Sequence, residues 1–139
     1  MAKLRAETWG TEAYWRGRIP GYMTGTLSPR DALAARVVYV AVMGRAVVGL
    51  SAGHLTRRHQ CDGELQWIDV IAAEQGRGIG GDLLRLLARW FVERQALRVC
   101  VDVQPTNLRA RQFYARHGAC DLKASWMVWE DIQVALGDS

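Results

Sequence analysis

The segment that most constrains this chain is a glycine-rich stretch at residues 75–81, Gln-Gly-Arg-Gly-Ile-Gly-Gly. Glycine lets a backbone pass close to a ligand because no Cβ intervenes. A helix that begins inside such a loop directs unpaired N–H groups, and the positive end of its dipole, at whatever lies in front of it. The stretch therefore predicts a phosphate-binding loop at the start of a helix.

The residues on either side of this loop support a strand–loop–helix unit. Residues 64–71, ELQWIDVI, are mostly apolar and rich in β-branched side chains, which predicts a strand. After the loop, apolar side chains recur at the spacing of a helix that is buried on one side: Leu83, Leu84, Leu86, Leu87, Trp90 and Phe91. We therefore expect a helix over residues 79–94.

Two motifs overlap in the glycine stretch, and they indicate different cofactors. Gly76, Gly78 and Gly81 form G-x-G-x-x-G, the dinucleotide fingerprint, and Asp102 follows at about the distance expected of a ribose-binding acid. Gln75, Gly78 and Gly80 form Q-x-x-G-x-G, which resembles the pyrophosphate loop of the GNAT-type N-acetyltransferase superfamily. A glycine pattern alone fits either class, a dinucleotide-binding oxidoreductase or an acetyltransferase.

The position of the loop in the chain separates the two classes. A dinucleotide fold opens with its fingerprint strand and then needs several further βα units. Here the loop lies in the middle of a 139-residue chain, and too few residues follow Asp102 to build the rest of such a sheet. An acetyltransferase would carry its loop after several strands and would end soon afterwards, as this chain does.

A second segment also resembles the GNAT-type superfamily. Residues 107–118 fit the pattern N-x-x-A-x-x-F-Y-x-x-x-G, which in that superfamily forms the helix after the fifth strand. The resemblance implies that Asn107 approaches the pantetheine arm of acetyl-CoA and that Tyr114 lies beside its sulfur. It covers roughly residues 36–130, with Ala72 where a proline is frequent and Ala119 where a phenylalanine often follows the glycine.

The order of predicted elements matches the architecture that this resemblance implies. We expect one domain over residues 1–139, of the α/β class (α+β by some conventions), with a mixed, mostly antiparallel sheet and a central βαβ unit. The expected helices lie at residues 5–18, 31–36 (one turn), 79–94 and from a cap at Thr106 or Asn107 to Gly118. The expected strands lie at residues 37–43, 46–55, 64–71, 97–103 (parallel to 64–71), 119–122 and 125–130. Only Ala2–Ala6 is a candidate for the first strand of the superfamily.

The implied reaction is transfer of an acetyl group from acetyl-CoA to a primary amine, and it needs a base and an acid. Glu64 is the candidate base because several members of the superfamily carry a catalytic glutamate at this spacing before the loop; a strand-end glutamate paired with an arginine is the alternative. Asp69, Asp102 and His54 are further options. In a regular strand Asp69 would face away from Glu64, unless a bulge intervenes. Tyr114 is the candidate acid for the departing thiolate, or else a core aromatic residue.

The cofactor-binding residues follow from the loop and from the strand before it. The N–H groups from Gly76 to Gly81 would hold the pyrophosphate beside Gln75, and Arg77 would add positive charge, or would only be a solvated loop residue. Val70 and Ile71 would offer backbone groups to the pantetheine arm, and the Val70 N–H would polarise the thioester carbonyl. Asn107 can both cap its helix and contact the pantetheine.

Composition bounds the partners. The net charge of +4 comes from arginines spread along the chain, so we expect a basic surface that attracts an anionic cofactor and no nucleic-acid site. There is no 18-residue apolar run and no apolar leader, which favours a cytoplasmic protein that does not enter a membrane. Three widely spaced cysteines predict reduced thiols and no metal site. The acceptor would be a small-molecule or peptide amine, and a homodimer is a habit of the superfamily. A non-catalytic acyl-CoA-binding module stays an alternative.

Overall fold

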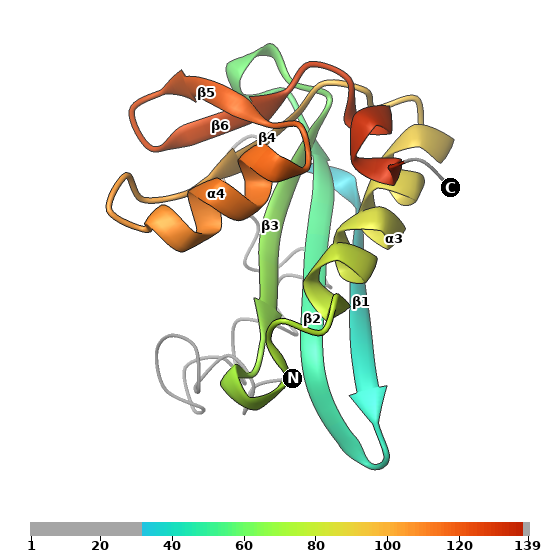
Figure 1. Cartoon of the computed structure of the whole chain (residues 1–139). Helices are drawn as coiled ribbons and strands as arrows, with labels where there is room; N and C mark the ends of the chain where they lie inside the picture. The colour runs from blue at the N-terminus through green and yellow to red at the C-terminus, as the bar shows by residue number, and fades with distance from the viewer. Residues whose placement is uncertain (1–31, 138–139) are drawn as a thin grey trace.

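The computed structural model describes residues 32–137, and the expected helix at 5–18 and the first-strand candidate Ala2–Ala6 lie outside them. The described part is a mixed six-stranded sheet in the order β1-β2-β3-β4-β6-β5. Two α-helices, α3 (Ile79–Glu93) and α4 (Leu108–Arg116), lie over the same face of this sheet (Figure 1). Within residues 32–137, none of the helices has the length and apolar character needed to span a bilayer.

The strand pairing confirms the predicted fold class. The antiparallel strands β1 (Ala32–Met43), β2 (Ala46–Thr56) and β3 (Gly63–Val70) follow one another in space, and β4 (Val99–Asp102) runs parallel to β3. Helix α3 connects β3 to β4, which gives the expected βαβ unit. The sheet is completed by β6 (Trp126–Trp129) beside β4 and by β5 (Cys120–Lys123) at the edge.

The helical turn expected at residues 31–36 is wrong. Strand β1 already begins at Ala32, and its backbone pairs Ala32 with Thr56 and Arg36 with His54 of β2, with an irregularity between the two pairs. The segment Asp-Ala-Leu-Ala-Ala-Arg is rich in good helix formers, which is why propensity favours a helix there. The hydrogen-bonded ladder to β2 outweighs that local preference, because propensity is a weak prior against tertiary pairing.

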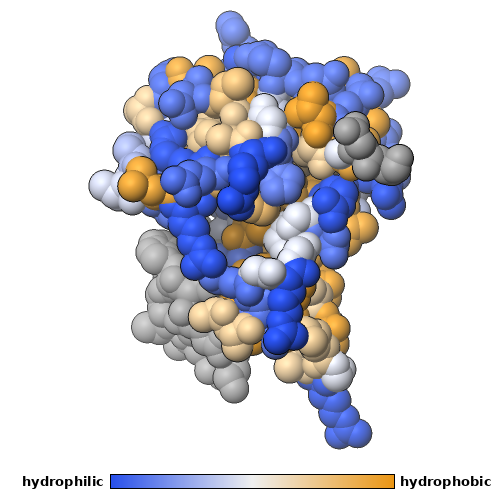
Figure 2. Space-filling view, viewed as in Figure 1, coloured by the Kyte–Doolittle hydropathy of each residue, from blue (hydrophilic) through white to orange (hydrophobic). Residues whose placement is uncertain are grey.

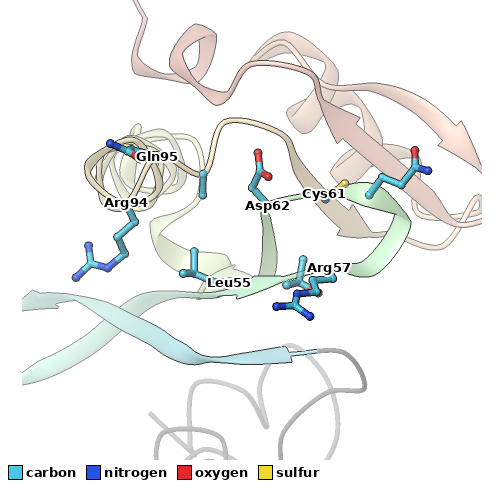
Figure 3. A pocket seen from close by; sticks show the side chains of 9 residues that line it. Leu55, Arg57, Cys61, Asp62, Arg94 and Gln95 are labelled. Carbon is cyan, nitrogen blue, oxygen red and sulfur yellow. The ribbon is translucent and has the colours of Figure 1, made fainter.

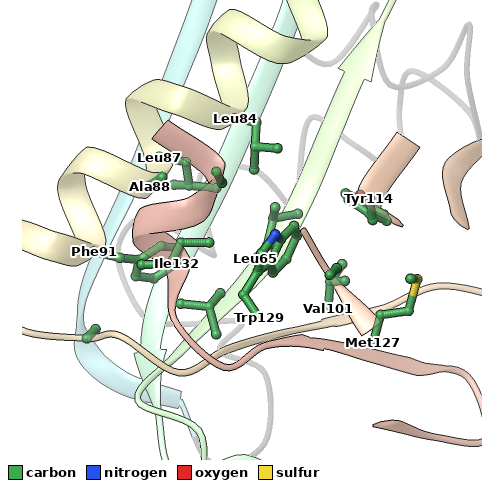
Figure 4. Close-up of a cluster of buried hydrophobic side chains, with 14 of the residues drawn as sticks. Leu65, Leu84, Leu87, Ala88, Phe91, Val101, Tyr114, Met127, Trp129 and Ile132 are labelled. Atoms are coloured by element: carbon green, nitrogen blue, oxygen red, sulfur yellow. The ribbon is translucent and has the colours of Figure 1, made fainter. Parts of the chain in front are cut away.

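The main hydrophobic core lies between α3 and the sheet (Figure 4). Leu84, Leu87 and Phe91 of α3 are fully buried against the sheet. A Cβ placed on Gly63 would lie 2.5 Å from the Phe91 ring, so only glycine lets the helix approach β3 this closely. The short 3₁₀ segment η3 (Ile132–Leu136), which the sequence analysis does not predict, packs Ile132 onto the same helix.

Strand β3 contains a bulge that changes which side chains share a face. Ala52 of β2 pairs with Trp67, but the next residue, Gly53, pairs with Leu65, so Gln66 is an extra residue in β3. Gly49 and Gly53 face α3, and their partners in β3 lie on that same side. Glu64 and Asp69 pair with His54 and Leu50 and therefore both lie on the opposite face. The bulge that the sequence left open is present, and it places both carboxylates on one face.

Candidate active-site cleft

The parallel strands β3 and β4 separate, and a cleft opens where they part. Their pairing is limited to Gly63–Leu65 against Val99–Val101. Beyond that point a cleft of about 690 Å³ is bounded by the end of β3, the beginning of α3 and one side of α4. Figure 2 shows this face of the molecule hollowed, with apolar surface at depth and hydrophilic side chains around the opening. The cleft can therefore take an elongated ligand with an apolar part and a charged part.

The glycine loop forms the wall of the cleft at the start of α3. Gly76 and Gly78 both have φ of +83°, which L-residues with a side chain rarely adopt, and Gly78 is the N-cap of α3. The Gln75 side-chain amide donates a hydrogen bond to the Val70 carbonyl over 2.9 Å. The loop is therefore bent by its glycines and tied to the end of β3 by Gln75.

The first turn of α3 presents unpaired donors to the cleft. The first backbone bond of the helix runs from the Asp82 N–H to the Gly78 carbonyl, at 3.0 Å, so the amides of Ile79, Gly80 and Gly81 have no partner within the helix. All three residues line the cleft. Together with the dipole of a 15-residue helix, these amides make an anion-binding position.

The free edge of β3 contributes backbone groups to the opposite wall. The Ile71 N–H donates to the Val48 carbonyl of β2 at 2.9 Å, and the Ile71 carbonyl accepts from the Glu74 N–H at 3.0 Å. Ile71 is therefore already engaged within the chain. Because successive residues of a strand direct their backbone groups to alternate sides, the N–H groups of Ile68 and Val70 point away from β2, toward the cleft. Both of these residues line it.

Helix α4 supplies Asn107 and Tyr114 to the cleft. The Asn107 carboxamide oxygen accepts from the Ala110 N–H at 3.2 Å, which confirms Asn107 as the N-cap of α4. Tyr114 is 7% exposed and packs edge-on against Phe113 and Trp129, with ring centroids 5.5 and 5.7 Å away. Its ring therefore belongs to the core while its residue also borders the cleft.

Glu64 lies deeper along β3 and is not part of the cleft lining. It is 4% exposed, and its Oε1 lies 3.3 Å from Arg58 Nε and 3.5 Å from His54 Nε2. His54 is fully buried and stands directly opposite Glu64 in the β2–β3 register. The arginine pair anticipated as an alternative is thus observed, and Glu64 belongs to a cluster of three ionisable side chains, of which Glu64 and His54 are buried and Arg58 is partly exposed.

Positive charge surrounds the opening of the cleft. Arg85, Arg109, Arg116 and His117 line it, against the carboxylates of Asp69 and Glu74. Arg109 and Arg116 form no ion pair with any residue from 32 to 137, whereas Arg85 pairs with Asp82. The His117 imidazole Nδ1 lies 2.8 Å from the Phe113 carbonyl, and its Nε2 lies 3.5 Å from where a Cβ on Gly81 would be. This basic rim complements a ligand with several phosphates.

The fold brings most of the predicted site residues together. Those that line the cleft are Val70, Gln75, Gly76, Gly78, Gly80, Gly81, Asn107 and Tyr114. Glu64, Ile71 and Arg77 do not line it; Arg77 is exposed and pairs with Glu74 at 3.3 Å. Asp102 is exposed at the end of β4 and also lies outside the lining, away from the position of a ribose-binding acid.

Other cleft residues carried no strong signal in the sequence. Arg85 follows Gly81 by one helical turn, and that spacing could have indicated that it returns to the loop. Arg109 and Arg116 are two among many scattered arginines, and His117 lies inside the second motif at a position where the pattern allows any residue. Arg58 reaches Glu64 only because the chain turns back after β2.

The family model for the acetyltransferase (GNAT) family matches residues 4–119, which is most of the chain. The protein therefore belongs to the acetyltransferase (GNAT) family, as the two motifs predicted. A comparison with curated proteins returns no match.

Solved structures of the same fold agree. A GNAT-family protein from Desulfovibrio desulfuricans is similar with a TM-score of 0.69 and 14% identity over 87% of this chain and 80% of its own. The PaiA N-acetyltransferase of Thermoplasma acidophilum, solved in complex with coenzyme A, is similar with a TM-score of 0.65 and 14% sequence identity. The match covers 91% of this chain and 87% of that protein. An IAA acetyltransferase from Bacillus cereus is similar with a TM-score of 0.57 and 25% sequence identity, and the match covers 63% of this chain and 57% of that protein. These likenesses concern the fold.

Proposed function

We propose that the protein is an N-acetyltransferase that binds acetyl-CoA in the cleft between β3, α3 and α4 and transfers its acetyl group directly to a primary amine. The observation that carries this proposal is the convergence on one cleft of a glycine loop at a helix N-terminus, an unpaired strand edge and Tyr114. Phosphates, a pantetheine amide chain and a thioester need these three features in that order. Family membership and the coenzyme A complex of the similar Thermoplasma protein support the same ligand.

The residues around the cleft fit acetyl-CoA from one end to the other. The amides of Ile79, Gly80 and Gly81 would bind the pyrophosphate, with the arginines of the rim supplying countercharge. The N–H groups of Ile68 and Val70 would hydrogen-bond the pantetheine arm as an added strand. The sequence favours Val70 and Ile71 in this role, but both backbone groups of Ile71 are engaged within the chain, so we assign the contact to Ile68 and Val70. Asn107 would reach the arm from α4 after satisfying its capping bond.

The same geometry suggests how the chemistry proceeds. The thioester supplies the acetyl group. The protein must accept a proton from the ammonium, stabilise negative charge on the carbonyl oxygen, and donate a proton or a hydrogen bond to the departing thiolate. A backbone N–H of β3 aimed into the cleft would stabilise the oxygen. Tyr114 borders the cleft from α4 and would donate its hydroxyl proton, or a hydrogen bond, to the thiolate.

Glu64 is the proposed base, and the bulge at Gln66 places it on the sheet face away from α3. A buried carboxylate that contacts both Arg58 and His54 would remove the proton through water, because Glu64 does not itself line the cleft. Asp69, which does line the cleft and lies on the same face, is the second candidate. The acceptor would be a small-molecule or peptide amine that approaches from this face.

The experiment that tests the proposal follows release of the coenzyme A thiol in the presence of a panel of primary amines. Turnover with at least one amine, lowered roughly 10²-fold or more in Tyr114→Phe and also lowered in Glu64→Gln, would support the assignment. Tight acetyl-CoA binding without thiol release for any amine would instead indicate a non-catalytic acyl-CoA-binding module. Binding of NAD(P)H in place of acetyl-CoA would instead identify the glycine loop as a dinucleotide-binding loop.

A further inference from the structure

Two cysteines from distant parts of the sequence meet on the sheet face opposite α3. Cys61 follows the 3₁₀ turn η1 (Arg58–Gln60), and Cys100 lies on β4. Both are buried, at 3% and 0% exposure, and they pack with Val128 in a small cluster separate from the main core. Both side chains are free thiols, so the pair is a dithiol held in place by the sheet.

The surroundings make the two thiols unequal. Arg98 Nη1 lies 3.7 Å from Cys61 Sγ, while its Nε donates to the Glu130 carboxylate over 2.9 Å. A hydrogen bond between the two cysteine side chains, reinforced by the Arg98 charge, lowers the pKa of Cys61 against the opposing effect of burial. The same hydrogen bond and burial raise the pKa of Cys100. Cys61 is therefore the better nucleophile and Cys100 the thiol that keeps its proton.

The residue Cys61 borders a cavity. A cavity of about 390 Å³ lies between the end of β2, the η1 turn and the end of α3, and Cys61 is on its wall (Figure 3). The turn that leads to Cys61 holds His59 and Gln60 at φ of 52° and 61°, in the left-handed region. This conformation costs non-glycine residues about 1–2 kcal/mol each, so the turn is locally strained.

We propose that Cys61 and Cys100 are an oxidisable dithiol that peroxides convert to an intramolecular disulfide. The Cys61 thiolate attacks one peroxide oxygen, the O–O bond breaks, and hydroxide leaves while Cys61 becomes a sulfenic acid. The Cys100 sulfur then attacks the Cys61 sulfur, an S–S bond forms, and the S–O bond breaks. The departing hydroxide takes the Cys100 proton and leaves as water. The hydroxide released in the first step takes up the proton that the Cys61 thiol had lost. For hydrogen peroxide, two thiols are thus oxidised to a disulfide and one peroxide is reduced to two molecules of water.

The disulfide would join the η1 turn to β4 at a sensitive place. Cys100 is the register partner of Glu64 on the neighbouring strand, and η1 carries Arg58, which contacts the Glu64 carboxylate. The cross-link would therefore fix the turn that positions this ion pair. The inference concerns the two thiols and holds whether or not the protein transfers acetyl groups.

The test uses the full chain with the exposed Cys120 replaced by serine, so that only the two buried thiols remain. The folded Cys120→Ser protein is treated with hydrogen peroxide, blocked with an alkylating agent under denaturing conditions, digested and mapped by mass spectrometry without reduction. We expect loss of both thiols together, a mass decrease of two hydrogens and a linked pair of peptides that contain Cys61 and Cys100. A dithiol reductant should restore both thiols.

A second pair of variants distinguishes Cys61, which reacts with the peroxide, from Cys100, which then forms the disulfide. In Cys120→Ser/Cys100→Ser, oxidation should stop at a Cys61 sulfenic acid that a dimedone probe captures; the matched Cys120→Ser/Cys61→Ser protein should give no adduct. Circular dichroism before treatment establishes that each variant is folded. Stepwise oxygen addition without a linked peptide would overturn the proposal. So would thiols that stay unoxidised in the folded Cys120→Ser protein under conditions that oxidise Cys120 in the wild type.

Discussion

Replacing Gly78 and Gly80 by alanine, one at a time, should change stability in opposite directions although both residues belong to one loop. Gly78 has φ of +83° and nothing within 4 Å of an added Cβ, so Gly78→Ala tests backbone conformation alone. Gly80 lies in the first turn of α3, and its added Cβ would be in ordinary contact with the Phe113 ring at 3.6 Å. Only Gly78→Ala therefore places alanine in a backbone conformation that is unfavourable for it.

The magnitudes follow from these two environments. Alanine in the left-handed region costs about 1–2 kcal/mol, so Gly78→Ala should lower the free energy of unfolding by that amount. Alanine at a position whose backbone it can adopt stabilises by about 0.4–1 kcal/mol, mainly through the unfolded chain, so Gly80→Ala should raise it. For a domain of this size each kcal/mol shifts Tm by about 3–5 °C. The two variants should therefore differ in Tm by roughly 4–15 °C.

Thermal unfolding followed by circular dichroism, first without ligand and then with acetyl-CoA, tests both parts of the reasoning. A ligand at 100 times its Kd stabilises the wild type by about 2.7 kcal/mol. The Gly80 methyl group would also lie 3.9 Å from Val70, between two walls of the cleft, so the more stable Gly80→Ala protein should gain less from acetyl-CoA than the wild type. Equal changes of Tm in the two ligand-free variants would refute the loop geometry. A gain in Tm from acetyl-CoA as large in Gly80→Ala as in the wild type would refute the binding position.

Three further substitutions probe the catalytic residues and the core. Tyr114→Phe should lower turnover roughly 10²-fold or more with little change in acetyl-CoA affinity, because it removes a hydroxyl and keeps the ring. Steady-state kinetics and a binding titration measure the two quantities, and unchanged turnover would contradict this role of Tyr114. Glu64→Gln should lower turnover and also lower the free energy of unfolding by about 1–3 kcal/mol, because it leaves the partly exposed Arg58 and the buried His54 beside a neutral group. Urea denaturation measures the stability separately from turnover, and unchanged stability would argue against the ion pair. Phe91→Ala should cost about 3–5 kcal/mol in the same urea assay because its ring is fully buried under Gly63, and a loss below 1 kcal/mol would contradict the packing.

Much of the fold was predictable because its strongest features are local. The helix at Ile79–Glu93 follows from the apolar spacing after the glycine loop, and the Asn107 cap and the left-handed Gly118 delimit α4 as the second motif indicates. The parallel pairing of β3 with β4 follows from the strand–helix–strand order. The two tryptophans of β6 differ in burial: Trp129 is fully buried, while Trp126 is half-buried and contacts Arg58 and His59.

The rest depended on contacts between distant residues. The start of β1 is decided by the ladder to β2 rather than by the helical propensity of residues 31–36. The bulge at Gln66 is invisible in the apolar pattern, yet it decides that Glu64 and Asp69 share a face. The pairing of Glu64 with His54 requires the exact register of β2 on β3, and the free backbone groups of Ile68 rather than Ile71 require the hydrogen-bond phase of that ladder.

Isothermal titration of the full chain with coenzyme A and with NADPH would show whether the glycine loop and the β3–α4 cleft bind acetyl-CoA. Gly78→Glu, which places bulk and negative charge against the phosphates, is the matched variant. We expect coenzyme A to bind the wild type and to fail to bind Gly78→Glu, and NADPH to bind neither protein. Undiminished coenzyme A affinity in Gly78→Glu, or binding of NADPH alone, would contradict this expectation.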